Sequence, residues 1–112
     1  MRTLKYSIPL IVADGGTTIE SSELPINGIL LGLVVVAPDL TSSNTYTASI
    51  LDEEGGTIIS YATLTENTTT SKYIDANNAY IHAPLHNPTV KIVSSGAETG
   101  AKTFTAHIYY ES

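Results

Sequence analysis

Hydrophobic and polar residues alternate along most of the chain with a period of two, and turn residues interrupt this alternation at short intervals. In the segment 3–13 one face is apolar, with the positions Leu4, Tyr6, Ile8, Leu10 and Val12. A period of two is typical of β-strands with one buried face. Because Pro9 has no N–H to donate, we predict that this segment is an edge strand or one that passes between sheets.

The rest of the chain continues the pattern. Segments 45–51 and 57–65 flank the acidic glycine turn "DEEGG" and are predicted to form an antiparallel hairpin. Near the carboxyl end the inward positions are predicted to be Val90, Ile92, Phe104, Ala106, Ile108 and Tyr110. About eight strands, with no helix and no repeat, indicate an all-β fold, an antiparallel β-sandwich of the jelly-roll type. Residues 1–112 are predicted to form a single domain.

One segment departs from the alternation. In "INGILLGLVVVAP", residues 26–38, both faces of the predicted strand are apolar. One face carries Ile29, Leu31, Leu33 and Val35, and the other carries Leu30, Gly32, Val34 and Val36. A strand in a two-layer sandwich normally has one polar face, so something outside the core must cover the second one.

Two kinds of cover are compatible with the sequence. A partner or a second copy of the chain would make Leu30, Gly32, Val34 and Val36 a self-association or partner interface. Alternatively, the loop 67–88 or the amino-terminal arm covers this face within the chain. Glycine at position 32 would in either case permit close approach of a neighbouring segment.

Length and charge restrict the possible partners. A chain of 112 residues supplies one core, without a third layer. The net charge of −6 and the scattered basic residues disfavour a nucleic-acid partner. The absence of cysteine excludes disulfides and thiolate metal sites. The apolar segment is about half the roughly 20 residues needed to span a bilayer, and Pro9 interrupts the apolar start, so neither a membrane segment nor a cleaved signal is expected.

No combination of residues indicates catalysis. His82 and His86 are four residues apart, but in an extended segment they lie roughly 13 Å apart, which is too far to share a metal. His107 is predicted on an exposed face. The oxygen-rich turns "DEEGG" (52–56) and "DANN" (75–78) lack a complete calcium-loop pattern and are interpreted as solvated turns. We therefore predict no enzyme activity, no cofactor and no metal site.

The tyrosines leave one alternative open. The chain has seven tyrosines, one phenylalanine and no tryptophan, and the expected exposed tyrosines are Tyr61, Tyr73, Tyr80 and Tyr109. Such rings often close the edges of a sandwich, but they also form platforms for sugar rings. A carbohydrate-binding or adhesive module is therefore the alternative function, and it would require these rings to form a concave cluster.

Three stretches carry a family resemblance: "GTTIESSELPINGILLGLVVVAP", "ASILDEEGGTIIS" and "HAPLHNPTVKIVSSGAETGAKTFTAHIYYES". The last combines a Pro-Leu segment, a short strand, a Gly/Ala-rich turn and a final strand that ends in aromatics. Together these stretches resemble small β-sandwich capsid decoration and cement proteins of tailed bacteriophages. The resemblance implies a structural virion protein on the capsid surface, assembled in the host cytoplasm, whose partners are the major capsid protein and itself, as a homotrimer.

Overall fold

The computed structural model describes residues 2–74 and 77–112, which form nine β-strands and one short 3-10 turn, η1. The elements are β1 (Thr3–Val12), β2 (Thr18–Glu20), β3 (Asn27–Val36), η1 (Thr41–Ser43), β4 (Tyr46–Leu51), β5 (Thr57–Leu64), β6 (Thr69–Lys72), β7 (Ala83–His86), β8 (Thr89–Ser94) and β9 (Lys102–Glu111).

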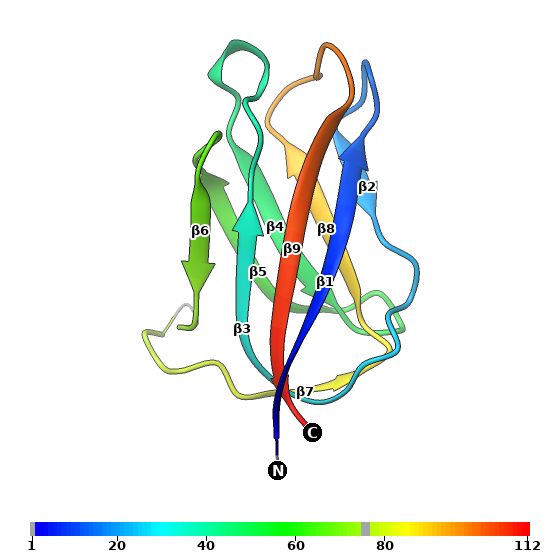
Figure 1. Ribbon diagram of the computed structural model, residues 1–112, viewed down its shortest axis with the longest axis vertical. Helices are drawn as coiled ribbons and strands as arrows, with labels where there is room; N and C mark the ends of the chain where they lie inside the picture. Colours follow the sequence, from blue (N-terminus) through cyan, green and yellow to red (C-terminus); the bar gives the residue numbers. More distant parts are fainter. Residues whose placement is uncertain (1, 75–76) are drawn as a thin grey trace.

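The strands form two antiparallel sheets packed face to face (Figure 1). The five-stranded sheet has the order β1-β9-β3-β6, and the short β7 also pairs with β3; the four-stranded sheet has the order β2-β8-β4-β5. Leaving β7 aside, four of the remaining eight strands lie in each sheet, and the chain passes repeatedly from one sheet to the other, as in a jelly roll. The predicted fold class is therefore confirmed.

Several individual strands follow the predicted pattern. β1 is an edge strand, as Pro9 indicated, and its exposed residues alternate with half-buried or buried ones along its length. β4 and β5 form the predicted antiparallel hairpin around the acidic turn. At the opposite end of the chain, β9 pairs with both β1 and β3 and so occupies the centre of the five-stranded sheet.

The core lies between the two sheets. The inward positions predicted on β8 and β9, from Val90 to Ile108, are completely buried, and Tyr110 is half-buried against the core. The rings of Tyr46 and Phe104 meet edge to face with their centroids 5.0 Å apart, which joins the two sheets. Among the described residues, no helix is long and apolar enough to cross a membrane.

Three loops meet at the upper end of the sandwich in Figure 1: β1–β2, β3–β4 and β8–β9. The carboxylate of Glu98, which is only 1 % exposed, joins two of them by accepting hydrogen bonds from the Thr41 backbone N–H, the Asn44 amide and the Ser94 hydroxyl. Backbone hydrogen bonds between Glu98 and the first loop complete the junction. Burial alone would raise the pKa of Glu98, but these hydrogen bonds outweigh it and lower the pKa to about 2.

Candidate functional site

The apolar strand predicted to have two covered faces is β3, and a β-bulge decides where its side chains point. Leu30 pairs with Tyr110 on β9, whereas Gly32 pairs with Tyr109, so Leu31 is an extra residue in the ladder. A bulge of this kind shifts the alternation of faces by one position. Leu30 consequently points into the core together with Leu33 and Val35 and is completely buried.

The bulge corrects part of the predicted face assignment. Leu30 was expected on the second face with Gly32, Val34 and Val36, and this placement is wrong because the extra residue comes between Leu30 and Gly32. The two residues predicted inward at the start of the strand, Ile29 and Leu31, are only half-buried. Gly32, Val34 and Val36 remain on the outer face of the five-stranded sheet, and we call them the outer column.

Polar residues flank the outer column on both sides. Val34 lies opposite His107 on β9 and Ser71 on β6. The ring of His107 in turn makes a 2.7 Å hydrogen bond to the hydroxyl of Ser7 on β1. The side chain of Val34 is 9 % exposed, whereas that of Val36 is 40 % exposed. Only the Val36 end of the column is therefore open to solvent.

A side chain from the 67–88 segment covers the other end of the outer column. A Cβ atom added at Gly32 would lie 2.3 Å from a ring carbon of Tyr73, so the ring lies in the space that a side chain at position 32 would fill. Tyr73 also contacts Tyr109, with ring centroids 6.4 Å apart. Intramolecular cover, one of the two possibilities open from the sequence, thus applies at Gly32, while it does not reach Val36.

Further apolar side chains lie at the open end of the outer face. Thr105 on β9 lies between Val36 on β3 and Pro9 on β1. Ile11 is two residues further along β1, on the same face, and is 51 % exposed. Both β1 and β3 end in the upper half of the sandwich in Figure 1. We call Pro9, Ile11 and Val36 the open apolar end.

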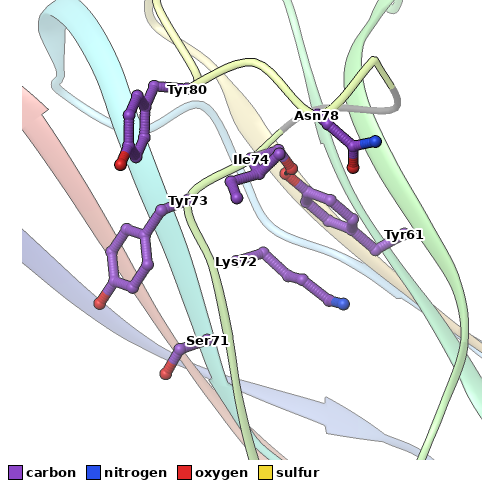
Figure 2. Close-up of a pocket in the computed structure, with 7 residues that line it drawn as sticks. All are labelled: Tyr61, Ser71, Lys72, Tyr73, Ile74, Asn78 and Tyr80. Carbon is purple, nitrogen blue, oxygen red and sulfur yellow. Dashed lines mark hydrogen bonds between the residues drawn. The ribbon is translucent and has the colours of Figure 1, made fainter.

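The tyrosines that were expected to be exposed gather at the end of β6 away from Val36, where a pocket of about 620 Å³ opens beside β5 and β6. Tyr73 and Tyr80 are exposed, whereas Tyr61 and Tyr109 are only half-buried. Tyr61, Tyr73 and Tyr80 line it together with Ile74 and Lys72 (Figure 2). The fourth predicted tyrosine, Tyr109, lies next to the pocket through its ring contact with Tyr73. Sequence spacing did not indicate this cluster, because its members come from separate segments that only the sheet order brings together.

The acidic turn 52–56 is stabilised by its own hydrogen bonds. In "DEEGG", the Asp52 carboxylate accepts hydrogen bonds from the backbone N–H groups of Glu54 and Gly56 at 2.9 and 2.8 Å, so it stabilises its own turn. Asp75 of "DANN" lies outside the described residues. His86 makes a hydrogen bond to Asn27. Within residues 2–74 and 77–112 there is no group of three or more His, Cys, Asp or Glu side chains suited to a metal ion.

No known family model and no curated protein matches the sequence. Solved structures do match the fold. The chain is similar to a chain in the capsid asymmetric unit of cyanophage Pam1, with a TM-score of 0.61, 17 % identity, and coverage of 98 % of this chain and 85 % of that one. It is also similar to a chain of the Bacillus endospore appendages, which are disulfide-linked pili, with a TM-score of 0.54, 13 % identity, and coverage of 96 % and 87 %. At such low identity these likenesses establish a shared fold, and both neighbours are parts of assemblies.

Proposed function

We propose that this protein is a structural virion protein, a decoration or cement subunit that binds the outside of a phage capsid. The observation that carries the proposal is the open apolar end, where apolar side chains of β1 and β3 are exposed on the outer face of the five-stranded sheet. Full burial of a Val or Ile side chain is worth about 1.5–3 kcal/mol, so covering Val36 and Ile11 favours association. Exposed apolar surface of this kind is typical of sites where proteins associate.

The structural neighbours support an assembly role rather than a catalytic one. One comes from a phage capsid and the other from a pilus, and both match nearly the whole chain. For this protein we infer the same kind of use: the outer face of the five-stranded sheet contacts a second copy, in a homotrimer, and other edges of the sandwich contact the major capsid protein. Decoration of a lattice requires neither a cofactor nor an enzymatic step.

Repetition on a shell makes modest contacts sufficient. Once one subunit of a trimer has bound, the next contacts form within the same complex at a high effective concentration, so weak individual contacts give tight overall binding. The net charge of −6 fits this location, because it weakens attraction to packaged nucleic acid. The site of action that follows is the virion surface, after assembly in the host cytoplasm.

Light scattering of the purified protein tests the self-association step. We expect a trimer for the wild type and a folded monomer for Val36→Glu, because a carboxylate at a buried contact would be desolvated without a partner. Val36 is a better position than Val34, since its 40 % exposure lets the variant fold, whereas Val34 is 9 % exposed. Circular dichroism checks that the variant is folded.

Val93→Glu is the matched control, because it makes the same change on β8, in the four-stranded sheet, at a half-buried position. It should leave the trimer intact. A wild type that is monomeric at all accessible concentrations, or a Val36→Glu variant that is still trimeric, would contradict the proposed interface.

A further inference from the structure

We infer that the tyrosine pocket beside β5 and β6 is a binding site for an oligosaccharide. This inference is independent of the assembly role, since it concerns different residues from the open apolar end. Among the described residues, five large hydrophobic side chains are exposed, and three of them, Tyr73, Ile74 and Tyr80, line this one pocket. Apolar side chains concentrated at one exposed place indicate a ligand or a partner.

The pocket has a fixed wall and an accessible face. The hydroxyl of Tyr61 donates a 2.9 Å hydrogen bond to the carbonyl of Ile74, and the ammonium of Lys72 lies 5.6 Å from the centroid of the Tyr61 ring. Tyr61 is therefore held by its own neighbours and forms the wall. The accessible rings are those of Tyr73, which is 44 % exposed, and Tyr80, which is 83 % exposed.

One of the two accessible rings, that of Tyr73, is also preorganised. Tyr73 rests over the backbone at Gly32 and against the ring of Tyr109, so its orientation is set before any ligand arrives. The backbone of Tyr80 forms a bridge to Ile74, which holds the base of the second ring close to the first. A site that needs little reordering loses less conformational entropy when its ligand binds.

Polar groups accompany the two rings. Figure 2 shows the hydroxyls of Tyr73, Tyr80 and Ser71 on one side of the segment that follows β6, and the side chains of Lys72 and Asn78 on the other. The lining thus combines apolar ring faces with hydroxyl, amide and ammonium groups. Pockets that bind small molecules combine apolar walls with a few polar groups in this way and occupy about 300–1,000 Å³.

A saccharide fits this combination of groups. A pyranose ring has a C–H face that packs on an aromatic ring, and hydroxyls around its edge that both donate and accept hydrogen bonds. The exposed rings of Tyr73 and Tyr80 supply stacking surface with polar tips at the ring edge. The pocket volume of about 620 Å³ is larger than one sugar ring, so the site has room for linked sugar units. The net charge of −6 argues against the other stacking ligand, a nucleic acid.

Binding is tested with a glycan array and with three soluble probes: maltotriose, triacetylchitotriose and trigalacturonate. The first two are neutral and the third is acidic, so the comparison shows whether Lys72 selects for negative charge. We expect saturable shifts of the ring signals of Tyr73 and Tyr80 in NMR spectra with at least one glycan. Titration to about 10 mM detects even a millimolar dissociation constant.

The variants Tyr73→Ala and Tyr80→Ala should each weaken that binding at least about tenfold, the effect expected from the loss of one stacked ring. Val93→Ala is the control, because it removes a half-buried apolar side chain from β8, which does not line the pocket, and it should bind normally. Tyr80 is 83 % exposed, so its truncation leaves the fold intact.

Two outcomes would overturn the inference. One is the absence of binding on the array together with no ring shifts from the three probes. The other is a change in the light-scattering mass on Tyr80→Ala with no change in sugar binding, which would make the cluster a protein contact. The first outcome leaves the assembly role untouched. The second would extend the self-association surface to the tyrosine cluster, and Val36→Glu would still be judged by its own mass.

Discussion

Glu98 shows how one residue can organise an end of the sandwich. Its carboxylate is almost completely buried and is stabilised by neutral donors: one oxygen accepts from the Thr41 N–H, and the other from Asn44 and Ser94, at 2.6–2.8 Å. The sequence offers no sign of this role, because "SSGAETGA" has the composition of an ordinary exposed turn. A buried carboxylate in a turn becomes recognisable only when the donors, which are 4 to 57 residues away in sequence, are brought around it.

We predict that Glu98→Gln destabilises the protein at pH 7 by about 1–3 kcal/mol, because an amide N–H₂ group would face donors that now meet a carboxylate oxygen. The loss should depend on pH. The pKa of Glu98 is lowered from 4.5 to about 2 on folding, so the unfolded chain takes up the proton first as the pH falls. The difference in unfolding free energy between the wild type and Glu98→Gln is therefore largest above about pH 5 and declines as the pH falls toward 2.

Urea denaturation of both proteins at pH 7, 4.5 and 3 measures this difference. Using the difference between the two proteins cancels the titration of the other carboxylates. Glu54→Gln, on an exposed turn, is the control and should change stability by less than about 0.5 kcal/mol. A loss for Glu98→Gln that is equal at all three pH values would show that the carboxylate charge does not contribute.

At the scale of the element, β3 marks the limit of periodicity as a guide. The apolar run predicted a strand with two covered faces, and the strand is present, but strict alternation assigned Leu30 to the wrong face. The bulge at Leu31 depends on how β3 fits against β9 and has no local signature in a run of Ile, Leu and Val. By contrast, β1 and β9 contain no bulge where they pair, and burial alternates along the whole of β1 and from Thr103 to Ile108 in β9.

Gly32 and Tyr73 form one packing unit on this strand, and a double-mutant cycle measures their coupling. Gly32→Ala alone should displace the Tyr73 ring and lower the unfolding free energy by about 1 kcal/mol, because the new Cβ would meet that ring at 2.3 Å. In a Tyr73→Ala background the same change should be neutral or stabilising by up to about 1 kcal/mol, since alanine suits a strand interior better than glycine.

The coupling follows from the unfolding free energies of the four proteins in urea. If Gly32→Ala is equally destabilising with and without the Tyr73 ring, another contact, such as the Lys72 carbonyl, limits the space at position 32.

At the scale of the whole molecule, composition and period predicted the sandwich, but the strand neighbours required the structure. β1 and β9 lie at opposite ends of the chain and pair along their whole length, with Thr3 opposite Glu111 and Val12 opposite Lys102. Nothing in the sequence of either strand identifies the other as its neighbour. The same topology brings the tyrosines of β5 and of the segment after β6 to one pocket, and Ile11 and Val36 to the open apolar end. Sites built from distant strands are visible to sequence analysis only as candidate residues, without their grouping.

The proposed trimer has a thermodynamic signature in the intact protein. When three folded subunits unfold to three separate chains, mass action stabilises each subunit by about 0.9 kcal/mol for every tenfold rise in concentration. For a domain of 112 residues this corresponds to a Tm increase of about 4 °C per tenfold. Calorimetry over a hundredfold range should therefore show a rise of about 8 °C for the wild type and for Val93→Glu. Val36→Glu should show a Tm that does not change with concentration and equals that of an isolated subunit. A wild-type Tm that does not change with concentration would mean that the open apolar end stays exposed in solution and binds a different partner.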